Sequence, residues 1–200
     1  MKNIALLAAA VGGVLLVFMF MSPNGGGPIE PSVIANQPLR VGVVAFDNNS
    51  GAYAPGWDFG ANIATTITSN LGGRRDFRIF ERQQLSQVIS EQKLNPLQNP
   101  DTAVKIGNLT GLQLLIVGKI TSANQQEVPT PMGKAVGTMV NVVFKAIDTE
   151  TGEIKVVDRT NAYAVGGKLE SGLNIPTVKK AIRKVGEKTA DRLDKYVKVV

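Results

Sequence analysis

Residues 39–46, Leu-Arg-Val-Gly-Val-Val-Ala-Phe, decide the fold class. The run is mostly apolar and rich in valine, which is typical of a strand buried on both faces of a sheet. Turn-forming residues follow at 47–51. Asp58 then stands where a helix N-cap is expected, before an apolar stripe with helical spacing that reaches Leu71. A buried strand followed by an amphipathic helix predicts an α/β domain.

The rest of the chain continues this pattern. Period-two and helical repeats predict further strands and helices, and a tight turn at 149–152 joins two of the strands as a hairpin. The predicted strands cover 77–80, 112–120, 138–147 and 154–164, and the predicted helices cover 81–92, 101–109 and 176–197. We expect a single α/β domain in which helices pack on a mixed sheet.

The composition excludes several kinds of chemistry. The chain has no Cys and no His, which excludes disulfides, thiol nucleophiles, Cys/His zinc sites and Ser-His catalytic pairs. No phosphate-binding loop and no G-x-S-x-G motif occurs. Asp47 and Asp58 flank a loop after the first strand, but a turn residue and a helix cap explain them better than a catalytic pair does. We therefore expect no enzyme, no cofactor and no metal site.

An uncharged apolar run from Ile4 to Met21 follows Lys2 at the N-terminus. It reaches the lower limit of the about 17–25 residues that a helix needs to span a bilayer, and it lacks a polar face. We expect an apolar helix that is an uncleaved membrane anchor, with a cleaved signal segment as the alternative. The residues assigned to anchoring are Ile4, Leu6, Leu7, Val14, Leu15, Leu16, Val17, Phe18 and Phe20.

The next segment, residues 22–38, contains several Gly and Pro residues and has no helical period. Such a composition predicts a flexible tether. We therefore divide the chain into an anchor or signal segment (1–21), a tether (22–38) and an α/β domain (39–200).

The last predicted helix carries most of the formal net charge of +6. Between Lys179 and Lys198, Lys and Arg outnumber Asp and Glu by eight to three. We interpret the basic side as a solvated face, with contact to an anionic membrane or partner as the alternative. Nucleic acid is not an expected partner, because the helix lacks interleaved aromatic residues. The candidate residues for an anionic partner are Lys180, Arg183, Lys184, Lys188 and Arg192.

Several blocks between about residues 39 and 160 resemble the curli secretion channel (CsgG-like) family. One block is Phe80-Glu81-Arg82-Gln83-Gln84-Leu85, followed by Ile89-Ser90-Glu91-Gln92-Lys93-Leu94. Other blocks in the family's order are 41–47, 101–120 and 146–154. The resemblance implies a CsgG/TolB-N-like α/β domain in the periplasm that packs side by side in rings. We take Phe80, Glu81, Arg82, Leu85 and Glu91 as the candidate interaction or oligomer surface.

The sequence also departs from that family. The lipidated Cys of the family's lipoproteins is absent. The stretches 121–137 and 164–175 lack the alternating apolar run of about 9–11 residues that a membrane strand needs, so we expect them to be loops without full barrel hairpins. A curli-type outer-membrane pore is therefore the least favoured function.

Two functions from different classes follow. The first is a non-enzymatic envelope protein that takes part in assembly or secretion of a cell-surface structure, as a homo-oligomer. The alternative is a membrane-tethered binding module that regulates a cell-wall enzyme, because activators of penicillin-binding proteins share a similar domain on a tether. Both imply protein partners in the envelope and a periplasmic domain that is anchored in a membrane, or released by signal cleavage.

Overall fold

The computed structural model describes residues 4–11, 14–21, 37–97, 99, 101–167 and 174–197. The chain divides into two compact units, Met1–Gln37 and Pro38–Val200, which are described separately.

In the first unit, β1 (Ile4–Val11) pairs with β2 (Val14–Met21) in antiparallel register, from Ile4 opposite Met21 to Val11 opposite Val14. This differs from the helix expected over this run. The physical reason lies in the sequence, where Gly12-Gly13 separates two apolar runs, and the second of them is rich in valine, leucine and phenylalanine. A Gly-Gly pair favours a two-residue hairpin connection. Among the described residues, no helix has the length and apolar character needed to cross a membrane.

The second unit is built on a mixed sheet with the strand order β5-β3-β6-β7-β8. Strand β3 runs parallel to its neighbours β5 and β6, whereas β6, β7 and β8 form an antiparallel meander. The short β4 pairs with β6 beyond the end of β3. The strands are β3 (Leu39–Val43), β4 (Asp47–Asn48), β5 (Phe77–Ile79), β6 (Leu114–Thr130), β7 (Gly133–Asp148) and β8 (Ile154–Gly166).

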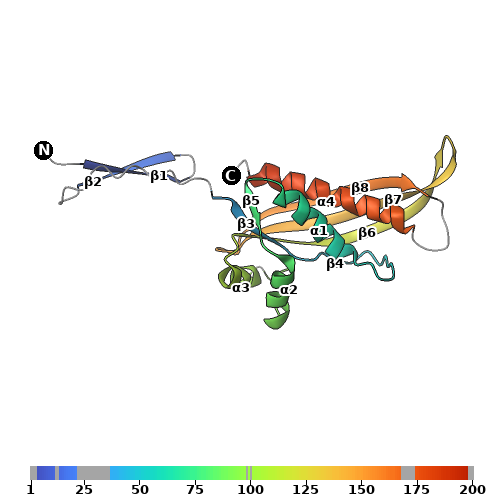
Figure 1. The fold of residues 1–200 in the computed structure, drawn as a ribbon, viewed down its shortest axis with the longest axis horizontal. Helices are drawn as coiled ribbons and strands as arrows, with labels where there is room; N and C mark the ends of the chain where they lie inside the picture. Colours follow the sequence, from blue (N-terminus) through green and yellow to red (C-terminus); the bar gives the residue numbers. More distant parts are fainter. Residues whose placement is uncertain are drawn as a thin grey trace. The chain divides into compact units, whose positions relative to one another are not determined.

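Helices cover the two faces of this sheet unequally. Figure 1 shows α1 and α4 along one face, and α2 and α3 against the other face at the β3 end. The helices are α1 (Phe59–Gly72), α2 (Arg82–Glu91), α3 (Asp101–Thr110) and α4 (Ile175–Val197). The expected α/β fold with a mixed sheet is confirmed, and Asp58 caps α1 as predicted, its Oδ1 accepting the Ala61 N–H at 2.9 Å.

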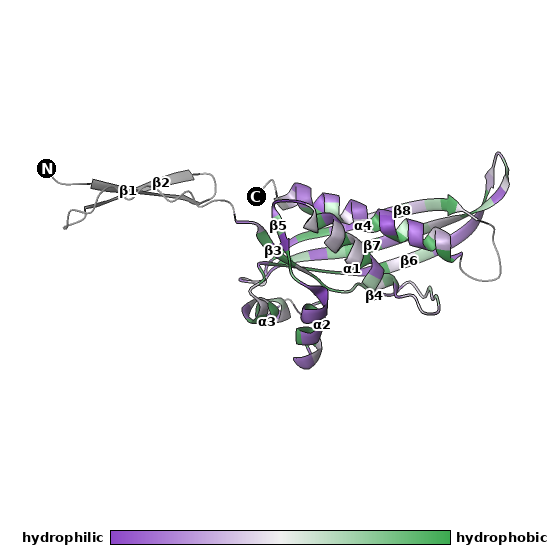
Figure 2. Ribbon diagram, in the orientation of Figure 1, coloured by the Kyte–Doolittle hydropathy of each residue, from purple (hydrophilic) through white to green (hydrophobic). Residues whose placement is uncertain are grey.

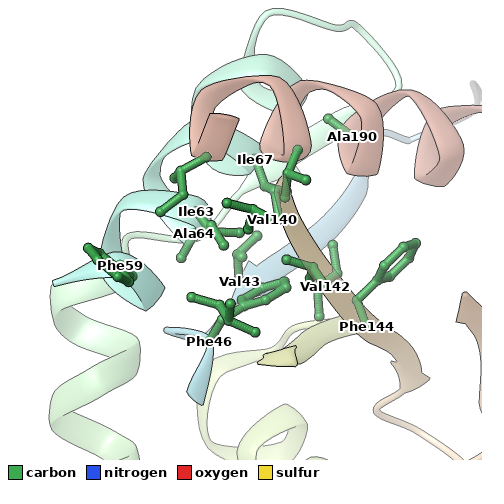
Figure 3. Packing of buried hydrophobic residues seen from close by; sticks show 14 of the residues in the cluster. Val43, Phe46, Phe59, Ile63, Ala64, Ile67, Val140, Val142, Phe144 and Ala190 are labelled. Carbon is green, nitrogen blue, oxygen red and sulfur yellow. The ribbon is translucent and has the colours of Figure 1, made fainter. Parts of the chain in front are cut away.

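The two faces have separate hydrophobic cores. The larger core lies under α1 and α4, where Ile63 and Ile67 meet Val140, Val142 and further buried side chains (Figure 3). The smaller core joins Leu85 of α2 and Ile106 of α3 to alternate residues of β6 and β7. Each strand therefore sends successive side chains to opposite faces, as its period requires.

The β6–β7 hairpin is longer than the sequence predicts. We expect a loop over 121–137, but the two strands stay paired as far as Thr130 opposite Gly133. Alternate positions explain this pairing, because Ala123 and Val136 are buried on the α4 face while Asn124 and Gln126 face solvent. Gln125 adds a cross-strand hydrogen bond from Nε2 to Thr138 Oγ1 at 2.8 Å. Of the second expected loop, residues 168–173 lie outside the described residues.

Candidate interaction surfaces

The motif at the start of α2 is mainly structural. Arg82 Nη1 donates to the backbone oxygen of Ala61 at 2.7 Å and to Thr65 Oγ1 at 3.3 Å, which ties α2 to α1. Leu85 is fully buried in the smaller core. The expectation that it belongs to the interaction surface is therefore wrong. The motif therefore fixes where α2 sits.

Of the five residues of the candidate surface, only Glu81 and Glu91 are exposed. Glu81 occupies the N-cap position of α2 without a capping hydrogen bond, and Glu91 accepts from Gln87 Nε2 at 2.8 Å. Phe80 is half-buried against the smaller core. Figure 2 shows α2 as a mainly hydrophilic element. What α2 offers to a partner is thus a polar surface with Glu81 and Glu91.

The basic side of α4 lies against the edge of the sheet. Lys184 Nζ donates to the backbone oxygen of Tyr163 at 3.1 Å, and Lys188 Nζ donates to that of Asn161 at 2.9 Å. These two carbonyls belong to β8, which ends the strand order. Exposed edge carbonyls invite pairing with another chain, and lysines at an edge discourage it. The two lysines therefore cover the edge strand.

Arg192 makes a third contact of this kind, an ion pair with the Asp158 carboxylate of β8. Partial burial alone would raise the pKa of Asp158, but hydrogen bonds from Arg192 and from the Arg159 N–H outweigh it and hold the pKa below its ordinary value. Of the five cations expected to face an anionic partner, Lys180 and Arg183 remain exposed without a contact to β8 in the described part of the chain.

The sequence analysis missed a further surface, the sheet face opposite α4. Beyond α2 and α3, no described helix covers the face formed by β6, β7 and β8 (Figure 1). In the strand register, Met139 lies opposite Tyr163, and Gly137 lies opposite Val165. The residues Met139, Tyr163 and Val165 are 36–37% exposed. A Cβ on Gly137 would lie 1.9 Å from the Tyr163 hydroxyl, so Tyr163 lies across Gly137. We call Met139, Tyr163 and Val165 the apolar face.

The hollow with the largest volume is lined partly by side chains that stabilise the fold. It measures about 590 Å³ and lies between β3, α3 and the turn after β7. There Asp148 Oδ1 accepts the N–H groups of Glu150 and Thr151, and Lys155 pairs with Glu153. Partial burial would raise the pKa of Asp148, but these backbone hydrogen bonds outweigh it and lower the pKa.

The structure does not bring the two candidate carboxylates together, because Asp47 and Asp58 line different hollows. No group of His, Cys, Asp or Glu suited to holding a metal ion occurs within the described ranges. The features that stand out are surfaces and strand edges, which suit a protein that acts by binding other molecules.

The chain thus has an α/β fold with a mixed sheet, and its exposed residues include an apolar patch on β7 and β8 and charged side chains on α2 and α4. The family model described as "Curli production assembly/transport component CsgG" matches residues 30–189. The chain therefore belongs to this family, and the resemblance drawn from the Phe80–Leu85 block is confirmed. No curated protein sequence matches the chain.

Solved structures share the fold at low sequence identity. The hypothetical protein CT253 from Chlamydia trachomatis has a TM-score of 0.52 and 13% identity, with 80% of this chain and 98% of that chain covered. Lipoprotein GNA1162 from Neisseria meningitidis has a TM-score of 0.48 and 12% identity, covering 77% and 99%. The PelC dodecamer from Paraburkholderia phytofirmans has a TM-score of 0.43 and 17% identity, covering 76% and 84%.

Proposed function

We propose that this protein is a non-enzymatic component of the cell envelope that takes part in assembly or secretion of a cell-surface structure, as a homo-oligomer. Membership of a family described as curli production assembly and transport components supports this role. In this proposal, residues 1–21 attach the protein to a membrane, residues 22–38 are a tether, and the α/β domain makes the contacts.

The observation that carries the proposal is the apolar face. Met139, Tyr163 and Val165 are neighbours across β7 and β8, and they remain more than one-third exposed. Fully burying a large apolar side chain contributes about 1.5–3 kcal/mol relative to leaving it exposed. Covering these partly exposed side chains with a neighbouring subunit gains a fraction of that amount at each residue, which favours association.

Charge supplies a direction for the association. Glu81 and Glu91 are exposed on α2, whereas Lys180 and Arg183 are exposed on α4, on the opposite face of the sheet (Figure 1). If α2 of one subunit meets the exposed start of α4 in the next, Glu81 and Glu91 face Lys180 and Arg183. Such a head-to-tail contact generates rings when its rotation closes.

Size-exclusion chromatography with light scattering tests this proposal, first on residues 38–200 and then on the full chain in detergent. We expect a mass of several subunits for the full chain. A strict monomer in both preparations would contradict the oligomer. A monomer that binds a purified cell-wall synthase would support the alternative role as a tethered regulator.

A further inference from the structure

A narrow groove runs along the uncovered sheet face where it meets the connection between α2 and α3. One hollow of about 190 Å³ lies beneath Leu94 and Pro96, with Ile89 and Val117 among its walls. A second hollow of about 90 Å³ is lined by Leu97, Gly118, Lys119, Val143 and Lys145. Leu97 and Gly118 line both hollows, so the two lie next to each other. We call them together the connector groove.

Three cations gather at the outer end of this groove. Lys119 of β6 lies opposite Val143 of β7, which in turn lies opposite Arg159 of β8. Lys145 lies two residues along β7 from Val143, on the same face of the sheet. Strand spacing puts Lys119 and Arg159 roughly 9–10 Å apart at the backbone. This is close to the Debye length of about 8 Å at physiological salt, so the three charges act as one positive cluster.

The charges of this cluster are not neutralised within the described part of the chain. None of the ion pairs there involves Lys119, Lys145 or Arg159. In contrast, a carboxylate pairs with each of Lys134 on β7, Lys155 on β8 and Arg192 on α4. One carboxylate, Asp47, lies opposite Lys119 in the register of β4 with β6. One carboxylate against three cations leaves an excess of positive charge beside the apolar groove.

The size and lining of the groove limit what can fill it. Small-molecule sites usually measure about 300–1,000 Å³, so each hollow is suited to a side chain rather than to a whole ligand. The walls are mainly apolar, and the open end is cationic. We propose that the connector groove binds a short segment of a protein partner in which large apolar side chains are followed by acidic residues.

The segment binds with its apolar side chains in the hollows beneath Leu94 and Leu97. Its carboxylates then meet Lys119, Lys145 and Arg159, where the guanidinium of Arg159 can hold a carboxylate through two parallel hydrogen bonds. The apolar face used for self-association lies further along β7 and β8, beyond Asn141 and its partner Ser122. The groove and the apolar face are therefore different parts of the same sheet face, and peptide binding is measured separately from self-association.

Fluorescence anisotropy on the full chain in detergent, at low ionic strength, tests this proposal. The probe is a labelled peptide with a Leu-Phe pair followed by a run of Glu. One comparison peptide has Lys in place of Glu, and another has Gly in place of the Leu-Phe pair. We expect the first peptide to bind at least about tenfold more tightly than either comparison peptide.

A pair of double variants locates the site. Lys119→Glu with Lys145→Glu should weaken binding of the acidic peptide by about tenfold or more. Arg75→Glu with Arg78→Glu, which makes the same charge change at exposed positions beside and on β5, should weaken it less than about twofold. Unchanged circular dichroism spectra establish that both variants fold. If the variant at Lys119 and Lys145 does not fold, Val143→Thr replaces it as a milder change in the groove.

Three results would overturn the proposal. The first is the absence of any binding by the unaltered protein, and the second is an equal loss in both double variants, which would indicate charge attraction alone. The third is equal binding of the peptide with Gly in place of Leu-Phe, since that would leave the apolar hollows without a role. Anionic phospholipid added as mixed micelles with the same detergent that competes fully with the peptide would also overturn it in favour of a membrane surface.

Discussion

Lys188 of α4 donates a hydrogen bond from Nζ to the backbone oxygen of Asn161 at 2.9 Å, across the open edge of β8. Lys184 makes the same contact one strand repeat further along, with Tyr163. The charge of the last helix is thus used within the molecule, where it covers a strand edge that another chain would otherwise be able to extend.

We predict that removing these two lysines promotes aggregation. Lys184→Ala with Lys188→Ala should leave the unfolding midpoint nearly unchanged, because exposed lysines contribute little to stability. The same variant should aggregate faster on mild heating, as followed by light scattering, because the β8 carbonyls become available. Lys180→Ala is the matched control on the same helix, and equal aggregation of control and double variant would contradict the role of the edge.

We predict that Arg82→Ala destabilises the domain by about 1–3 kcal/mol, the usual range for losing hydrogen bonds made by a charged group. The reason is that Arg82 alone joins the start of α2 to Ala61 and Thr65 in the hydrogen bonds described. Urea unfolding followed by circular dichroism measures the change. Gln83→Ala, on the exposed side of the same turn, should cost less than about 0.5 kcal/mol; equal costs would show that the motif has no structural role.

Gly60 should not tolerate a side chain. A Cβ at this position would lie 1.7 Å from the backbone oxygen of Phe46, which is closer than any side chain can approach. We expect Gly60→Ala to cost about 1–3 kcal/mol or more through displaced backbone. In contrast, Gly72→Ala places its Cβ 3.6 Å from Ile79 and should be neutral or stabilise the helix slightly. Thermal unfolding of both variants decides the matter, and similar midpoints would be inconsistent with this packing.

Acid should destabilise the domain through Asp158. Its pKa is held below the ordinary value of 3.8, so the charged carboxylate contributes stability above that value. This contribution is lost as the pH falls from about 4 through the lowered pKa of the folded state. Asp158→Asn should therefore flatten the fall in unfolding free energy below pH 4, whereas Glu150→Gln should not. Parallel curves for the two variants would contradict this assignment.

The sequence predicts much of the fold because its local signals agree. Asp58 is a good N-cap before an apolar stripe, and Gly72 with Gly73 ends the same helix, so the bounds of α1 follow directly. The order of the remaining elements follows from the same kind of pattern. The Phe80–Leu85 block also gives the family, which the match over residues 30–189 confirms.

The parts that escape prediction depend on partners distant in the sequence. Residues such as Asn124 and Gln126 are polar, and only their pairing with β7 shows that β6 continues through them. In the N-terminal unit, apolar residues suit a helix or a hairpin equally, and strand pairing decides between them. The bonds of Lys184 to β8 and the exposure of Tyr163 likewise depend on where α4 and α2 pack.

The most direct test of self-association through the apolar face is the mass of the full chain in detergent, measured by light scattering. The variant Met139→Ser with Tyr163→Ser removes that face, and Tyr53→Ser, in an exposed loop, is its control. We predict several subunits for the unaltered protein and the control, and a shift to monomer for the double variant. A monomeric unaltered protein, or a double variant with the mass of the control, would contradict the proposal.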